Sequence, residues 1–172
     1  ADNMMITRHV IREFGKYALG AEHSNLISSI VPGVMAQTGM ESLEIIRGVI
    51  RETEPDCIVA VDALAASRVK RLNRTIQITN TGINPGSGVG NHRHGLNRES
   101  VGIPVIAIGV PTVVDAATIV NDAISGYYEE VDCTLNSFFV TPKDIDESIK
   151  RLSFTISEGL NLAFEKTVCT NS

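Results

Sequence analysis

The sequence predicts an α/β fold with three layers, α/β/α, around a mostly parallel sheet. The chain has 172 residues, of which 43% are hydrophobic, and a domain of this size buries roughly 70% of its extended-chain surface. Uninterrupted apolar runs of strand length occur at residues 57–61 and 105–108, which is typical of parallel strands covered on both faces. Segments with helical spacing of apolar residues alternate with these runs. We therefore expect residues 1–172 to form a single α/β domain.

Helix boundaries are indicated by residues that favour the start or the end of a helix. Gly20 and Pro55 are expected to end the first two helices. Thr112 is the expected N-cap of the third helix, and Pro142 is the expected first residue of the last, after Thr141 as its cap. In chain order, the predicted elements are a helix at 3–19, an extended loop at 24–39, a helix at 41–54, strands at 57–61, 75–79 and 105–108, a helix at 112–124, and a helix from 142 to 164.

Composition and charge exclude several classes of protein. Fifteen Lys and Arg against 20 Asp and Glu give a net charge of −5, which argues against a general nucleic-acid binder. The uncharged, mostly apolar stretch of residues 101–114 contains glycines and prolines and is too short to span a bilayer. The three cysteines lack a C-x-x-C partner, so we interpret them as free thiols, with Cys57 buried in a strand. The sequence thus predicts a soluble, intracellular protein.

One segment of the chain is basic and contains no acid. Between residues 63 and 98 there are six basic side chains and neither Asp nor Glu, whereas acids dominate the rest of the chain. This asymmetry favours contact with a local acidic group on a substrate over contact with a long polyanion. For the basic residues of segment 68–74, an equal alternative is a solvated helix face that pairs with acids elsewhere in the fold. The six residues are Arg68, Lys70, Arg71, Arg74, Arg93 and Arg98.

Asp62 is the first candidate for catalysis. It directly follows the predicted strand 57–61, and ligands of open α/β sheets bind beyond the carboxyl ends of the strands. A rigidly held carboxylate with small neighbours suits general acid–base chemistry, although Asp62 could instead cap the next helix. Asp115, one turn into the predicted helix 112–124, is interpreted mainly as a cap of that helix and secondarily as a residue facing the cleft.

The glycine-rich segment 80–95 does not carry a nucleotide-binding signature. It lacks the G-x-x-x-x-G-K-[ST] pattern, and the residues that follow its glycines do not begin an apolar helix. We interpret it as a loop that faces the substrate. His92 and His94, at a spacing of two, could point the same way and ligate a metal. A second hypothesis is therefore a metal-dependent hydrolase, in which Asp62 with His92 or His94 holds a divalent metal that activates water. A serine nucleophile is a weaker alternative, because Ser67, Ser87 and Ser100 lack a G-x-S-x-G elbow.

Four segments carry distinctive motifs: DALAA at Asp62–Ala66, TIQI at Thr75–Ile78, GINPGSGVGN at Gly82–Asn91 and GIPVIAIGVPTVVDA at Gly102–Ala116. These motifs closely resemble the germination protease family of spore-forming bacteria. Shorter matches flank the longer ones, and the resemblance covers nearly the whole chain. The flanking matches are Thr7–His9, Pro32–Met35, Val140–Lys143 and Gly159–Asn161.

The resemblance implies an endopeptidase that degrades small acid-soluble spore proteins during germination, in the cytoplasm of the spore core. It implies cleavage beside acidic residues, a zymogen form, a homo-oligomer (a tetramer as a family trait), and a fold similar to hydrogenase-maturation proteases. No cofactor, nucleic-acid partner or membrane partner is implied. Because the specificity requires positive charge near the scissile bond, we expect Arg93 or Arg98 to bind the substrate carboxylate.

The family is grouped with aspartic-type peptidases because two aspartates are essential, and one of them corresponds to Asp62. The other belongs to a Thr-Pro-Asp-Ala-Leu-Gly-Pro motif, expected with its own strand shortly before Ala1. We therefore interpret the chain as a fragment of the full enzyme. Besides the paired-carboxylate peptidase and the metal-dependent hydrolase, a third hypothesis remains. The fragment would then be a folded binding or assembly module that binds the spore protein without cleaving it.

Overall fold

The computed structural model describes residues 3–14, 25–84, 94–124 and 137–164. The chain divides into two compact units, one of Ala1–Val31 with Asp146–Ser172 and one of Pro32–Ile145. The single-domain organisation stays a prediction. None of the described helices is long and apolar enough to cross a membrane. In chain order the elements are α1 (Arg8–Phe14), α2 (Met35–Thr38), α3 (Ser42–Thr53), β1 (Ile58–Ala65), η2 (Val69–Arg71, a 3-10 turn), β2 (Gln77–Thr79), α4 (Arg98–Val101), β3 (Val105–Asp115), α5 (Ala116–Ile124), β4 (Phe139–Val140) and α6 (Ile145–Phe164).

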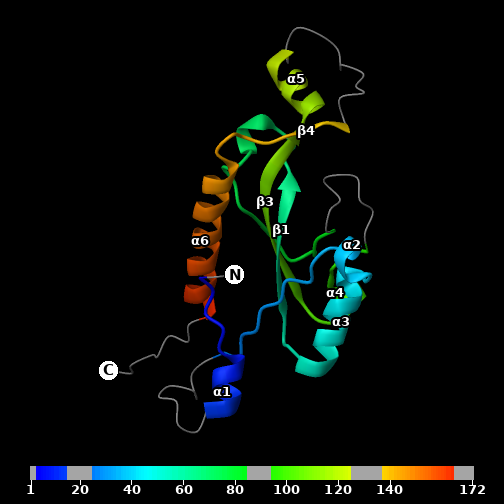
Figure 1. Cartoon of the computed structure of the whole chain (residues 1–172), viewed down its shortest axis with the longest axis vertical. Helices are drawn as coiled ribbons and strands as arrows, with labels where there is room; N and C mark the ends of the chain where they lie inside the picture. Colours follow the sequence, from blue (N-terminus) through cyan, green and yellow to red (C-terminus); the bar gives the residue numbers. More distant parts are fainter. Residues whose placement is uncertain (1–2, 15–24, 85–93, 125–136, 165–172) are drawn as a thin grey trace, which may run out of the picture. The chain divides into compact units, whose positions relative to one another are not determined.

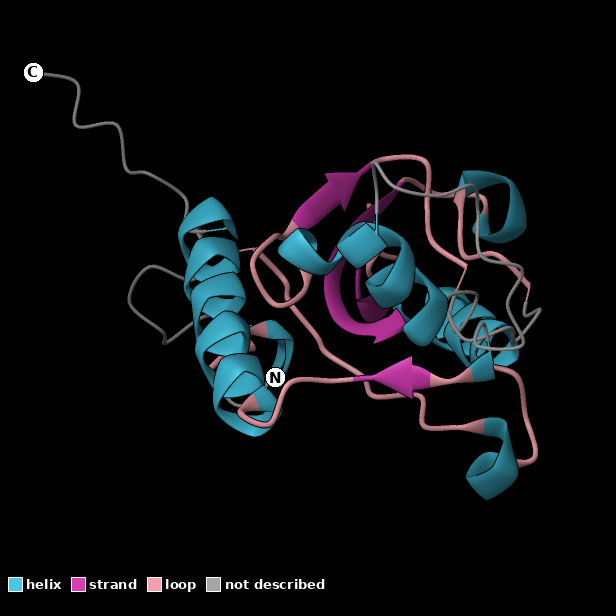
Figure 2. Cartoon of the chain, turned by 90° about the horizontal axis from the view of Figure 1, so that it is seen from above, coloured by secondary structure: helices cyan, strands magenta, loops and turns pink. Residues whose placement is uncertain are grey.

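The larger unit is built on a four-stranded sheet in which β3 is the central strand (Figures 1 and 2). β1 pairs with β3 in parallel from Ile58 opposite Val105 to Ala65 opposite Val113. The shorter strands β2 and β4 both pair with β3 in the antiparallel sense. Most paired residues thus belong to the parallel ladder, and the predicted α/β class with a mostly parallel sheet is confirmed. The three-layer arrangement stays a prediction.

Both long strands extend further than the sequence predicts. The predicted strand 57–61 is β1, which continues to Ala65, and β3 continues to Asp115. Sequence reasoning assigned Thr112 as the N-cap of a helix. That assignment is wrong, because residues 112–115 are still extended and α5 begins at Ala116. The β-branched side chains of Thr112, Val113 and Val114 favour a strand at this point.

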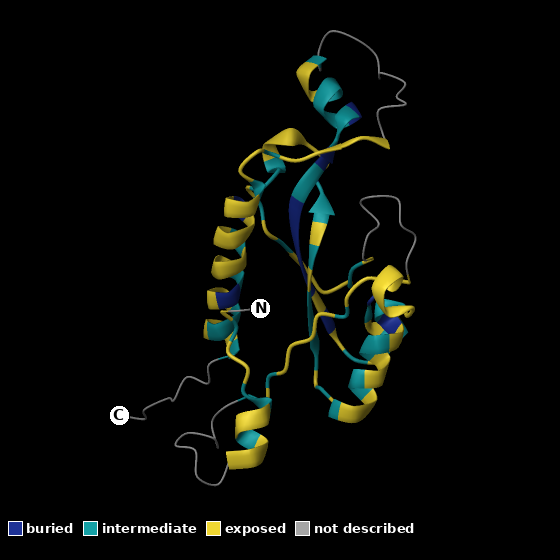
Figure 3. Cartoon of the chain, viewed as in Figure 1, coloured by how far each residue is buried: buried dark blue, intermediate teal, exposed yellow. Residues whose placement is uncertain are grey.

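Helix α3 covers one face of the sheet near the beginning of β1 and β3. Leu43 of this helix, Leu96 and Val105 of β3 form a buried cluster, against which Ile58 and Ala60 of β1 pack. The helix agrees with its predicted span, 41–54. The side chain of its N-cap, Glu41, and that of Glu44 form a capping box, an arrangement that satisfies otherwise free N–H groups. Buried residues concentrate along β3, as Figure 3 shows.

Several other predicted boundaries are corrected by the structure. The predicted strand 75–79 is reduced to the three residues of β2, and the predicted loop 24–39 contains the short helix α2. The last helix begins at Ile145 rather than at Pro142, because residues 142–145 form a turn in which Ile145 N–H donates to the Pro142 carbonyl. Helix α1 begins at Arg8, and the rest of its predicted span beyond Phe14 lies outside the described residues.

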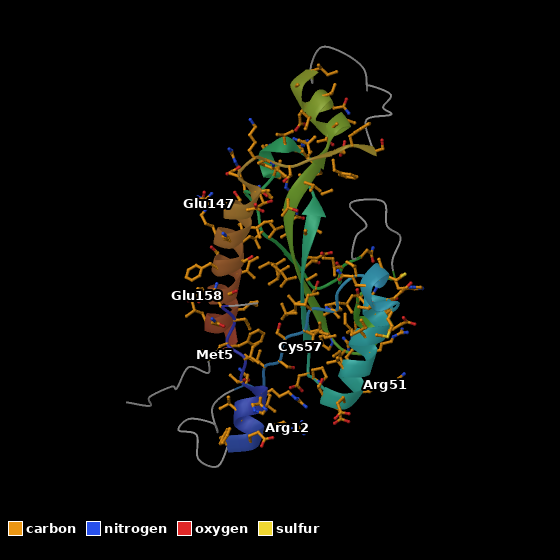
Figure 4. All side chains as sticks on the ribbon, in the orientation of Figure 1. Met5, Arg12, Arg51, Cys57, Glu147 and Glu158 are labelled. Atoms are coloured by element: carbon orange, nitrogen blue, oxygen red, sulfur yellow. The ribbon has the colours of Figure 1, made fainter. Side chains whose placement is uncertain are left out.

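In the smaller unit, the side chain of Asn161 on α6 forms hydrogen bonds with the backbone of Asn3 and Met5. Its side-chain oxygen accepts a hydrogen bond from Met5 N–H at 2.8 Å, and its amide nitrogen donates to the Asn3 carbonyl at 2.9 Å. Asn25 similarly donates to the Phe164 carbonyl at 2.7 Å. Figure 4 labels Met5 and, on α6, Glu158. Side-chain amides therefore join the two distant segments of this unit.

Candidate active site

Asp62 lies inside β1, directly opposite Gly109 of β3. It is neither at the strand end nor a helix cap, which corrects both sequence expectations. Because alternate residues of a strand face the same side, Asp62 shares its face with Ile58 and Ala60, the face that α3 covers at its other end. The carboxylate is thus held by a paired strand on the packed side of the sheet.

The two oxygens of the Asp62 carboxylate have different surroundings. Oδ1 accepts a hydrogen bond from Ala63 N–H at 2.9 Å, whereas Oδ2 is buried and has no hydrogen-bond partner among the described residues. Burying a polar oxygen without a partner is costly, and such atoms are rare enough to indicate a functional role or a bound group. Oδ2 is thus the oxygen of this carboxylate whose hydrogen-bonding capacity the described residues leave unused.

Gly109, the residue opposite Asp62, contributes no side chain to this part of the sheet. A Cβ built on Gly109 would lie 2.3 Å from Leu64 Cδ1 and 2.8 Å from Leu64 Cγ. Leu64, two residues beyond Asp62 on the same face, therefore occupies the space above Gly109. On the other side of Gly109, the register places Gln77 of β2.

Gln77 was not singled out by sequence reasoning. The signal that hydrophobic periodicity offers for it is the alternation of polar Thr75, Gln77 and Thr79 with apolar Ile76 and Ile78. That pattern assigns Gln77 to the polar side of a strand, but the sheet register is needed to align it with Asp62.

An isolated antiparallel bridge joins Ile83, near the start of the glycine-rich segment, to Leu96, directly after its end. Ile83 N–H donates to the Leu96 carbonyl at 2.9 Å, and Leu96 N–H donates to the Ile83 carbonyl at 2.8 Å. Gly82, before the bridge, has φ +89°, and a Cβ at this position would lie 2.3 Å from the Leu96 carbonyl oxygen, so the turn requires glycine. The predicted site residues His92 and Arg93, and also Ser87, lie outside the described residues.

The contact that the described residues show for the His94 side chain is with the carboxylate of Glu41. Its Nδ1 lies 2.7 Å from Oε2 of Glu41, the N-cap of α3, and its side chain is 74% exposed. Within residues 3–14, 25–84, 94–124 and 137–164, no group of three or more His, Cys, Asp or Glu side chains is placed to hold a metal ion.

Arg98 is the exposed first residue of the short helix α4. Its neighbours are held firmly, because Asn97 and Ser100 form a capping box and Arg47 of α3 donates to the Ser100 carbonyl at 3.0 and 2.8 Å. The Ser100 hydroxyl is occupied in that box, since it donates to the Asn97 carbonyl at 3.0 Å. Ser100 is therefore a structural residue, whereas Arg98 presents its charge to solvent beside the end of the loop.

The remaining candidates have structural positions. Asp115 caps α5, because its two oxygens accept from Thr118 N–H and from the Thr118 hydroxyl, each at 2.7 Å. Its structural interpretation is thus confirmed. Cys57 lies just before β1 and is half-buried, which corrects its placement inside a strand (Figure 4). The basic residues of segment 68–74 lie in and around the 3-10 turn η2 and not on the face of an α-helix. The Val69 N–H of this turn donates to Asp122 at 2.7 Å.

Comparison with known proteins places the sequence among peptidases. A family model described as germination protease matches residues 1–131. The germination protease of Caldanaerobacter subterraneus is 42% identical over 193 residues, covering 95% of this chain and 59% of that protein. That of Clostridium perfringens is 40% identical over 192 residues, covering 94% and 58%. That of Bacillus velezensis is 54% identical over 123 residues, covering 72% and 33%. The chain thus spans less than two thirds of the length of these relatives.

Proposed function

Since the chain belongs to the germination protease family, we propose that it carries part of the catalytic site of an endopeptidase that degrades small acid-soluble spore proteins during germination. The supporting observation is the Asp62 carboxylate, with one oxygen fixed by Ala63 N–H and the other buried without a partner among the described residues. The resemblance of the DALAA segment to the family, given above, assigns one of two essential aspartates to this position.

Peptide hydrolysis requires two proton transfers that this carboxylate is suited to share. Water loses a proton as its oxygen bonds to the carbonyl carbon, and the leaving amine gains one as the C–N bond breaks. In the paired-carboxylate mechanism, one carboxylate accepts the first proton and the other, protonated, donates the second. Because Oδ1 of Asp62 accepts the hydrogen bond from Ala63 N–H, we assign the proton transfer to Oδ2. Either role is open to Asp62, and the second family aspartate takes the other.

The acidic specificity of the proposed reaction is assigned to Arg93 or Arg98. Arg98 is exposed and stands two residues after Leu96, whose bridge to Ile83 closes the glycine-rich loop. A guanidinium forms strong, charge-assisted hydrogen bonds with a carboxylate. Arg98 supplies such a charge beside the loop, and Arg93 adds a second one within it.

The proposed setting is the cytoplasm of the spore core, where the enzyme is a homo-oligomer, a tetramer as a family trait. The net charge of −5 supports a protein substrate rather than direct contact with nucleic acid. The fold is proposed to be similar to that of hydrogenase-maturation proteases.

The test uses both this chain and the full-length protease, in which the sequence is accompanied by the rest of the length seen in its relatives. Each is incubated with a purified acid-soluble spore protein, with and without a chelator, and cleavage and binding are measured. We expect the full-length protease to cleave in both conditions and to contain no stoichiometric metal. Loss of cleavage on chelation, restored by a metal, would instead support the hydrolase with Asp62 and His92 or His94. Binding without cleavage by the chain alone is the result that the fragment hypothesis predicts.

A further inference from the structure

The sheet register places Gln77 in the same row as Asp62. Asp62 is opposite Gly109 in the parallel ladder, and Gly109 is opposite Gln77 in the antiparallel ladder. Residues that are opposite each other in adjacent strands direct their side chains to the same face. Gly109 contributes no side chain, so Asp62 and Gln77 are the two polar side chains of this row, on either side of the glycine.

The separation suits a bound peptide. Adjacent strands lie about 4.8 Å apart, so the α-carbons of Asp62 and Gln77, two strands apart, are separated by about 10 Å. The Leu64 side chain, which lies over Gly109, gives the surface between them an apolar floor. A peptide segment that lies over Leu64 could contact the Asp62 carboxylate on one side and the Gln77 amide on the other.

The Gln77 amide is available for such a contact. Gln77 is half-buried, and its side chain forms no hydrogen bond with any residue in the described part of the chain. Thr79, two residues further along the same face, differs because its hydroxyl lies 2.8 Å from that of Thr81. A primary amide carries both a donor and an acceptor, which match the C=O and N–H of a main-chain peptide group.

We propose that Gln77 binds the main chain of the substrate across the sheet from Asp62 and so positions the peptide for cleavage. The inference rests on the proposed function, because it needs the reaction to take place at Asp62. Gln77 recognises the backbone and is indifferent to the substrate side chain, whereas the arginines recognise the acidic residue. It is a positioning residue, and its loss weakens substrate binding more than it slows the chemical step.

The test compares Gln77→Leu with Ile78→Thr in the full-length protease. Ile78 is the adjacent residue, faces the opposite side of the sheet and is 69% exposed, so it serves as a matched control. KM and kcat are measured on a peptide with an acidic cleavage site and on its amide counterpart. We expect Gln77→Leu to raise KM about five- to tenfold for both peptides, with kcat changed less than twofold, since one or two neutral hydrogen bonds are lost. Ile78→Thr should leave both constants near the wild-type values.

An unchanged KM in Gln77→Leu overturns the inference, as does a loss of kcat that matches a loss of folded protein. If Gln77→Leu folds poorly, Gln77→Glu, which keeps the side-chain shape but removes the donor, replaces it in the same assays with the same expected rise in KM. Asp62→Asn is measured in the same series. An active Asp62→Asn variant contradicts the proposed function, whereas an inactive one together with an unchanged KM in Gln77→Leu contradicts the role of Gln77 alone.

Discussion

The side chain of Leu64 occupies the space above the α-carbon of Gly109, the residue beside Asp62 in the sheet. The contact joins the two longest strands at the level of the proposed active site. It also explains why a residue without a side chain stands between Asp62 and Gln77. A larger residue at position 109 would displace Leu64 and disturb the row in which both polar groups lie.

Gly109→Ala should destabilise the protein, because the new Cβ would lie 2.3 Å from Leu64 Cδ1. Overpacking of this kind costs about 1–3 kcal/mol. Gly48→Ala is the control: nothing lies within 4 Å of a Cβ at that position in α3, so alanine should stabilise the helix by about 0.5–1 kcal/mol. Denaturant unfolding measures both. If Gly109→Ala is as stable as wild type, the packing of Leu64 over Gly109 is wrong.

Asp115→Ala should cost about 1 kcal/mol of stability, because it removes the cap of α5 and both hydrogen bonds to Thr118. Asp115→Asn, which keeps an acceptor for Thr118 N–H, should cost less. Because this role is structural, cleavage per folded molecule should be unchanged in both variants. A loss of cleavage without a loss of stability would return Asp115 to the catalytic candidates.

Arg98→Ala should selectively impair cleavage of acidic sites. Loss of a charge-assisted contact predicts a fall of about tenfold in kcat/KM for an acidic peptide, with little change for its amide counterpart. Arg93→Ala is compared in the same assay, and at least one of the two variants should show the selective loss. Arg51→Ala removes another exposed arginine, on α3 (Figure 4), and should leave the preference unchanged. If both Arg93→Ala and Arg98→Ala keep the wild-type preference, the charge that sets the specificity lies in residues 68–74 or in another part of the full-length protease.

Local signals in the sequence predicted part of the fold well. Helix α3 was predicted almost to the residue, because its apolar stripe lies between Glu41 and Pro55. The predicted apolar runs became the two long strands, but their ends were placed too early. Whether residues 63–65 continue a strand depends on pairing with β3, which is a long-range contact that local propensity does not contain.

The site was predictable in its chemistry but not in its geometry. Asp62 was identified as a carboxylate next to an apolar run, yet its position inside β1 follows from the ladder with β3. The antiparallel direction of β2, which brings Gln77 into the same row, depends on how the chain returns to the sheet. Sequence spacing alone therefore gave no reason to link residues 62 and 77.

Asp62→Asn in the full-length protease is the most direct test of the proposed function. The substitution is nearly isosteric, and the asparagine side-chain oxygen is able to keep the hydrogen bond from Ala63 N–H. We therefore expect the thermal midpoint to stay close to that of the wild type while kcat on an acid-soluble spore protein falls about 10²–10⁴-fold, because the group that exchanges protons is lost. Asp56→Asn, at an exposed position just before β1, is the matched control and should cleave normally. Cleavage by Asp62→Asn at a near wild-type rate would remove Asp62 from the mechanism and contradict the account.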